Sequence, residues 1–128
     1  MTIERQKLGE SGEDLAADEL AARGYAIVAR RHRLRGGEID IIARDGETLV
    51  FVEVRRRSHG DFGSAAESVT PWKQRQVVRM AVEYLAREGL YDKCPVRFDV
   101  VAIDDRPSGA PRIVVIPGAF DASACGRL

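Results

Sequence analysis

The sequence predicts a single α/β domain over residues 1–128, in which helices flank a mixed sheet. Two segments repeat their apolar residues at helical spacing, and five shorter segments are rich in Val, Ile, Phe and Tyr, as strands are. Their order is helix, three strands, helix and two strands, which favours a meander joined by a crossover helix to a further strand. We place the core at about residues 9–117 and a C-terminal tail at 118–128.

The first helix is predicted at about residues 12–23 because its apolar side chains form one stripe. Ser11 can cap its first turn, and Gly24 can end it. Residues 25–29 are rich in strand formers. The basic run at residues 30–35 follows, and we expect it to form a positively charged turn after this strand.

Two strands at about residues 38–44 and 48–55 are predicted to pair as an antiparallel hairpin. The dipeptide Asp45-Gly46 between them readily supplies the positive φ angles of a tight turn. Further along, Thr70 and Pro71 are expected to open a second helix that runs to about Glu88, since proline is tolerated at the first helical position. Strands follow at 96–103 and 112–116.

The composition limits the classes of function. Lys plus Arg and Asp plus Glu both number 20, so any contact with nucleic acid must rest on a local basic patch. Cys94 and Cys125 lack metal-ligand spacing, which argues against a zinc site and fits a reducing cytoplasm. No segment resembles a signal peptide or a membrane span. We therefore expect a cytoplasmic protein that does not bind membranes.

Carboxylates interrupt the predicted hairpin strands. With a two-residue turn at Asp45-Gly46, Glu38 faces Glu53 and Asp40 faces Phe51. The acids then share one sheet face with Arg55. The opposite face is wholly apolar and carries Ile39, Ile41, Ala43, Val50, Val52 and Val54. A shift of one residue would bury an acid among the valines, which disfavours that register.

Acids placed this close need a positive partner. A divalent cation is one candidate, because Mg²⁺ prefers carboxylate oxygens. The other candidate is Arg55, in which case the acids belong to an ion-pair network that only closes the end of the sheet. The residue pattern alone leaves both interpretations open.

Six motifs along the chain carry a family resemblance and together cover residues 9 to about 103. They are Gly9-x-x-Gly12-Glu13-x-x-Ala16, Gly37-Glu38-Ile39-Asp40, Val50–Val54, Phe62-Gly63, Val69-Thr70 with Lys73, and Arg97–Val101. With them the chain resembles the restriction-endonuclease-like superfamily of PD-(D/E)XK nucleases, which has an α-β-β-β-α-β core. More closely, it is similar to the YraN family of uncharacterised bacterial proteins, which resembles Holliday-junction resolvases.

The resemblance implies an endonuclease that uses Mg²⁺ or Mn²⁺ to hydrolyse phosphodiester bonds of structured or branched nucleic acid. Asp40 and Glu53 would hold the cation, and Glu13 would reach in from the first helix. The position where the superfamily carries lysine falls on Arg55, which can stabilise phosphate charge but is effectively never a base. Lys73 on the second helix could replace that lysine, or the cation alone could activate water.

Arginines beside the predicted acidic site are expected to bind flanking phosphates; they are Arg31, Arg33, Arg35, Arg56 and Arg57. DNA is favoured over RNA as the partner, and the oligomeric state is left open, a dimer included. An alternative is a non-catalytic nucleic-acid-binding module with the same fold, which the arginine at position 55 favours. A protein-interaction scaffold is a third reading, and only the zero net charge supports it.

Two further residues have a plain structural interpretation. Trp72 lies in the first turn of the second helix, where we expect a core anchor rather than a platform for base stacking. Asp99 could neighbour the acidic site, or it could simply pair with Arg97.

Overall fold

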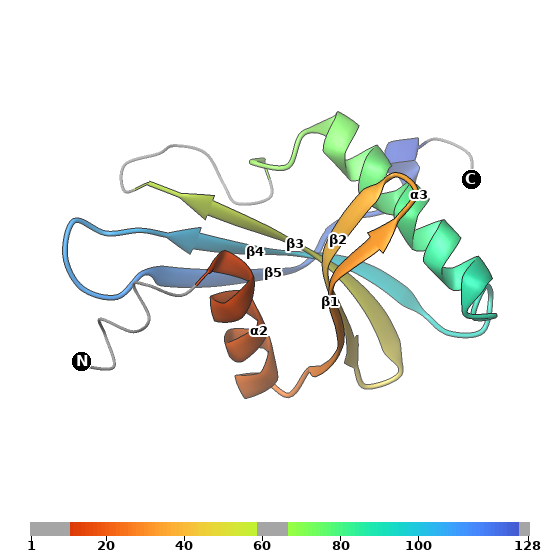
Figure 1. Ribbon diagram of the computed structural model, residues 1–128, viewed down its shortest axis with the longest axis horizontal. Coiled ribbons are helices and arrows are strands. Elements are labelled where there is room, and N and C mark those ends of the chain that lie inside the picture. Colours follow the sequence, from red (N-terminus) through yellow and green to blue (C-terminus); the bar gives the residue numbers. More distant parts are fainter. Residues whose placement is uncertain (1–10, 59–66, 126–128) are drawn as a thin grey trace.

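The computed structural model describes residues 11–58 and 67–125, and Figure 1 shows a twisted sheet with one helix on either side. The five strands are ordered β1-β2-β3-β4-β5; β3 and β4 run parallel, and the other neighbours are antiparallel. This confirms the predicted α/β fold. The elements are α2 (Gly12–Ala22), β1 (Ala26–Leu34), β2 (Gly37–Asp45), β3 (Thr48–Arg57), α3 (Pro71–Arg87), β4 (Val96–Asp104), β5 (Arg112–Phe120) and a short 3-10 helix, η1 (Ala122–Cys125).

Part of the predicted motif pattern lies outside the described residues, namely Gly9 and the Phe62-Gly63 pair. The two helix starts are confirmed. The Ser11 side chain accepts a hydrogen bond from the Asp14 backbone N–H, and Thr70 does the same for Lys73. Pairs of this kind satisfy backbone donors that the first turn leaves without partners.

The helices α2 and α3 cover opposite faces of the sheet. Beneath α3, Ile42, Leu49 and Phe51 pack against the buried stripe of that helix. Beneath α2, the alternate residues Ile41 and Val50 belong to a second cluster. Because β2 and β3 are buried on both faces, they carry nearly continuous apolar runs.

The basic run does not form a turn. Residues 30–34 continue β1, which pairs with β2 through contacts such as Arg30 with Ile41 and Arg33 with Glu38. Only β2 borders β1, so β1 is an edge strand. Basic side chains are common on edge strands, where they discourage pairing with another chain.

The hairpin turn is displaced by one position from the prediction. Asp45 pairs with Thr48, so Gly46 and Glu47 form the turn, and Gly46 has a φ of +62°. A turn with glycine at its first central position is as compatible with a hairpin as the predicted one. The register therefore shifts by two residues: Phe51 pairs with Ile42 rather than with Asp40.

The shift preserves the two sheet faces, with one exception. Ile39 packs in the cluster beneath α3, not on the apolar face where its place in the strand predicts it. The regular pairing of β2 with β3 ends at Ile41 and Val52. Beyond that pair the Asp40 side chain accepts a hydrogen bond from the Val54 backbone N–H, which breaks the alternation of faces.

Strand β5 extends past the predicted start of the tail. Its residue Phe120 pairs with Phe98 of β4, and the two rings stack with their centroids 5.2 Å apart. The register changes between Phe98 and Val100. The residues from Gly118 to Phe120 therefore belong to the sheet.

Asp99 pairs with Arg97, which was one of the two interpretations. Its side chain is 0% exposed. It accepts hydrogen bonds from the Tyr25 hydroxyl at 2.8 Å, from Arg97 Nε at 2.8 Å and from the Gly118 backbone N–H at 3.0 Å. Burial and the neighbouring Asp99 carboxylate raise the pKa of Tyr25 to about 12. This network joins β4 and β5 to Tyr25, the residue just before β1, and gives the buried Asp99 carboxylate the partners that it requires.

Asp99→Asn is expected to lower the free energy of unfolding by roughly 2–3 kcal/mol, because Arg97 loses its buried partner but keeps Asp45 and some solvent. Urea denaturation measures the change. Asp105→Asn is the control, since it removes an exposed ion pair with Arg56 and should cost less than about 1 kcal/mol. Equal losses in the two variants would contradict a structural role for the Asp99 network.

Candidate functional site

An acidic pair lies where β2 and β3 separate. Asp40 Oδ2 is 2.8 Å from the Val54 backbone nitrogen, so its carboxylate takes a position that a backbone carbonyl would hold in a regular ladder. Glu53 lies beside it, close enough for Asp40 to raise the pKa of Glu53. We define Asp40 and Glu53 as the acidic pair.

Glu53 is the unusual member of the acidic pair, because it is only 4% exposed. Burial, followed by the hydrogen bond and the charge of Asp40, raises the pKa of Glu53 to about 8. Near neutral pH Glu53 is therefore mainly protonated. Glu53 Oε2 has no hydrogen-bond partner among the described residues. A buried acceptor in this state is costly, and a cation would relieve the cost.

Lys73 supplies the nearest positive charge. Its Nζ lies 3.5 Å from Glu53 Oε2, and its presence opposes the rise in the Glu53 pKa. The Thr70 cap sets the first turn of α3 over this end of the sheet, which places Lys73 above the acidic pair. The arrangement thus joins two carboxylates and one ammonium group.

Arg55 occupies a different environment. Its side chain is exposed and forms no ion pair within the described part of the chain. Of the two cationic residues that the sequence suggested, Lys73 is therefore the one that contacts Glu53.

Glu13 and Glu38 lie outside the acidic pair. Glu13 projects from α2, and its Oε2 is 3.5 Å from the Arg31 guanidinium. Glu38 was expected opposite Glu53, but it faces β1 instead, where it pairs with Arg33 at 2.9 Å. Within residues 11–58 and 67–125, no group of three His, Cys, Asp or Glu side chains is placed to hold a metal ion. The structure brings together two of the three predicted acidic ligands.

Most of the arginines predicted to bind phosphate are paired with carboxylates. The pairs are Arg31 with Glu13, Arg33 with Glu38, Arg56 with Asp105, and Arg57 with Asp104. Arg35 is exposed, and its backbone N–H lies 3.4 Å from Glu83. The expected basic rim is therefore largely compensated by acidic side chains, so phosphates would have to compete with these carboxylates.

Trp72 is not a core anchor, because its side chain is 64% exposed. The helical period contained the signal for this. At 3.6 residues per turn, Trp72 lies opposite the stripe that contains Val77, Ala81 and Tyr84, whereas Lys73 falls near the buried side. A place in the first turn does not by itself bury a side chain.

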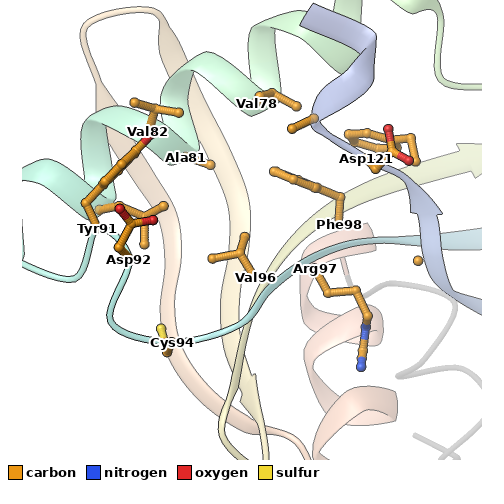
Figure 2. Close-up of a pocket in the computed structure, with 14 residues that line it drawn as sticks. Val78, Ala81, Val82, Tyr91, Asp92, Cys94, Val96, Arg97, Phe98 and Asp121 are labelled. Carbon is orange, nitrogen blue, oxygen red and sulfur yellow. The ribbon is translucent and has the colours of Figure 1, made fainter. Parts of the chain in front are cut away.

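A cavity of about 500 Å³ lies away from the acidic pair. Figure 2 shows its walls, to which α3 contributes Val78 and Ala81 and β4 contributes Val96 and Phe98. Arg97 points away from the other lining side chains, toward its hydrogen bonds with Asp99. Val96 pairs with Leu49, so the cavity is at the hairpin end of the sheet. Its mainly apolar walls hold no buried acid pair, and we place the candidate chemistry at Asp40 and Glu53.

Glu53→Gln is expected to raise the free energy of unfolding at about pH 8 by about 1–3 kcal/mol in EDTA and to change it little at about pH 5. The pKa of folded Glu53 is about 8, above its ordinary 4.5. Between these values the folded protein binds more protons than the unfolded chain, so wild-type stability is full at low pH and falls as pH rises. Glutamine cannot ionise and removes this fall. Urea denaturation at the two pH values measures the effect.

Glu38→Gln is the matched control, because Glu38 lies on the same strand but pairs with Arg33 at the surface. It should leave the pH dependence of stability as in the wild type. If the wild-type protein were equally stable at both pH values, Glu53 would not titrate as its burial implies.

No helix within the described residues is long and apolar enough to cross a membrane.

Comparison with known proteins gives a family. The model of the uncharacterised protein family UPF0102 matches residues 12–103. A UPF0102 protein of Geobacter sulfurreducens is 50% identical over 114 residues, which span 89% of this chain and 88% of that protein. A UPF0102 protein of Geotalea uraniireducens is 49% identical over 118 residues, or 92% of each chain. One from Symbiobacterium thermophilum is 49% identical over 117 residues, or 91% of this chain and 98% of that protein.

Proposed function

The chain belongs to the uncharacterised protein family UPF0102, and we propose that it is a metal-dependent endonuclease acting on structured or branched nucleic acid. One observation carries the proposal. It is the pairing of half-buried Asp40 with buried Glu53, whose pKa is raised to about 8, and the position of Lys73 Nζ 3.5 Å from Glu53 Oε2. A buried acid, a half-buried acid and an amine gathered on adjacent elements are more than sheet closure requires.

The acidic pair fits a divalent cation. Mg²⁺ and Mn²⁺ favour carboxylate oxygens, and Mg²⁺ is usually held by one or two carboxylates together with water and substrate phosphate. Glu53 Oε2, which has no hydrogen-bond partner among the described residues, would gain one. A bound cation would supply a Lewis acid that polarises the phosphate and makes water a better nucleophile.

The side chains of this protein would have separate tasks. Asp40 is held in place by the Val54 backbone N–H, so one of its oxygens is already oriented. Lys73 can donate a hydrogen bond to a phosphate oxygen and stabilise the negative charge that grows there during hydrolysis. Arg55 is exposed and can contact a phosphate outside the acidic pair. Glu13 remains outside this set, paired with Arg31.

The proposal places the family in the restriction-endonuclease-like superfamily, near the resolvases. The order of α2, three antiparallel strands, α3 and a parallel β4 supports this placement. So do the acids of β2 and β3, which lie just beyond the last regular pair of these strands, Ile41 with Val52. We propose DNA rather than RNA as the substrate, and a cytoplasmic site of action.

The second candidate function is nucleic-acid binding without catalysis. The observation in its favour is the arginine at position 55, where the resembled nucleases carry lysine. Such a module would keep the fold and the basic side chains and would bind nucleic acid without cleaving it.

Cleavage of a panel of substrates tests the proposal. Single-stranded, duplex, flap and four-way DNA would be incubated with the protein in Mg²⁺, Mn²⁺ or EDTA. We expect cleavage of a flap or four-way substrate with a metal and none in EDTA. Binding without cleavage in either metal would favour the second candidate function. Neither binding nor cleavage would overturn both.

A further inference from the structure

We infer that Trp72 and two arginines on the outer side of α3 form a docking surface for an unpaired nucleic-acid strand, which deepens the proposed function and rests on it. We define the α3 stripe as Trp72, Arg75 and Arg79. These residues are three and four positions apart, so they lie in one row along the helix.

The α3 stripe borders a groove. This groove has a volume of about 260 Å³, and Gly36, Gln76, Met80 and Glu83 complete its walls. An indole that is 64% exposed leaves a large apolar ring in water, next to a concave surface that a flat ligand can enter.

The floor of the groove is fixed by the turn between β1 and β2. Gln76 Nε2 donates a hydrogen bond of 2.6 Å to the Gly36 carbonyl, which holds this turn against α3. Gly37 has a φ of +137°, and a Cβ there would lie 3.2 Å from Gln76 Nε2. A side chain at Gly37 would therefore be strained and would press on the residue that lines the groove.

The charge of the groove favours an anionic ligand. The described strand arginines 30, 31, 33, 56 and 57 each have a carboxylate partner. Arg79, in contrast, is exposed and has no ion-pair partner in the part of the chain that the structure describes. The acid in the groove, Glu83, is paired with Arg87 at 2.9 Å. Arg79 therefore gives the α3 stripe a positive charge that can meet a phosphate.

The position of the α3 stripe links it to the acidic pair. Trp72 directly precedes Lys73, whose Nζ contacts Glu53. A strand with its base stacked on Trp72 would therefore lie on the same helical turn as the residue that contacts the acidic pair. Bases within an intact duplex are already stacked on one another, so the surface suits an unpaired strand, as in a flap or an opened junction.

Intrinsic fluorescence tests this inference, because Trp72 is the only tryptophan of the chain. The protein would be titrated in EDTA and low salt with oligothymidine and with a blunt DNA hairpin of equal length. Stacking on Trp72 should quench its emission with oligothymidine and not with the hairpin. Trp72→Ala should weaken binding of fluorescein-labelled oligothymidine by about 10- to 100-fold, and Trp72→Phe by less, because phenylalanine can still stack.

Tyr91→Ala is the matched control, since Tyr91 is 48% exposed but lines the apolar cavity. It should bind oligothymidine as the wild type does. Arg79→Ala should lower the slope of log affinity against log salt by about one. Absence of quenching, or equal losses of affinity in Trp72→Ala and Tyr91→Ala, would overturn the inference. The exposed indole would then be better explained as a contact for a protein partner.

The two proposals fail separately, because the titration requires no cleavage. Quenching by oligothymidine in a protein that cleaves nothing would support the docking surface and count against the nuclease. Metal-dependent cleavage without quenching would support the proposed nuclease function and overturn the docking surface.

Discussion

Asp40→Asn is expected to lower the rate of cleavage of a branched DNA substrate by roughly 10³-fold or more. The reason is that a bound cation would stabilise the negative charge of the transition state by several kcal/mol, and the variant would no longer hold that cation. Asparagine keeps an oxygen that can accept the hydrogen bond from the Val54 backbone N–H, so the strand ends should stay in place. It removes the negative charge that the acidic pair needs to hold a divalent cation. Single-turnover rates with excess protein measure the loss.

Binding should survive this substitution. Affinity for the same DNA, measured by fluorescence anisotropy in EDTA, should change by less than about threefold, because basic side chains supply most of the attraction to phosphate. Glu38→Gln is the control for cleavage, since Glu38 is an acid of the same strand that pairs with Arg33. If Asp40→Asn cleaved as fast as Glu38→Gln, the acidic pair would not be the active site.

Lys73→Ala is expected to lower the cleavage rate by about 10²- to 10³-fold, as removal of a donor to a developing negative charge usually does. Arg55→Ala should cost less than about tenfold, because Arg55 is exposed and could contact only a flanking phosphate. Arg55→Lys should retain activity, because the positive charge is kept. Rates at saturating substrate separate these effects from changes in binding.

The reverse order would change the assignment. A larger loss in Arg55→Ala than in Lys73→Ala would make Arg55 the residue that acts on the phosphate. The contact of Lys73 with Glu53 would then serve only to balance a buried charge. A wild type that cleaves nothing, together with an active Arg55→Lys variant, would mark the chain as a binding module that has lost turnover.

The helix starts could be predicted from the sequence because their causes are local. Ser11 and Thr70 cap turns that lie within three residues of them, and Pro71 fixes its own φ angle. The alternation of apolar side chains likewise predicted the two faces of the hairpin.

The hairpin register could not be chosen from sequence. Asp45-Gly46 and Gly46-Glu47 are both acceptable two-residue turns, because each contains the glycine that a positive φ requires. A shift of two residues leaves every side chain on its face, so the hydrophobic pattern does not distinguish the registers. The deciding factor is tertiary: the fit of Phe51 beneath α3 and the capture of the Val54 N–H by Asp40.

The sequence predicted that Asp40 and Glu53 are neighbours, but it did not predict which residues surround them. Asp40 and Glu53 meet as expected, whereas Glu38 turns to Arg33 on the edge strand. Glu38 can meet Arg33 only because β1 continues through the basic run and pairs with β2 there. A run of charged residues, taken alone, predicts a turn instead of a strand. The contact between Lys73 and Glu53 depends on where a crossover helix settles on the sheet, which local sequence does not specify.

Binding of Mn²⁺, measured by titration calorimetry near pH 7 in buffers of different ionisation enthalpy, tests the acidic pair most directly. We expect about one ion per chain and release of about one proton, because the cation must displace the proton held by Glu53, whose pKa is about 8. Binding should be lost in Glu53→Gln and retained in Glu38→Gln. Undetectable binding by the wild type, or equal binding by Glu53→Gln, would contradict the proposed site.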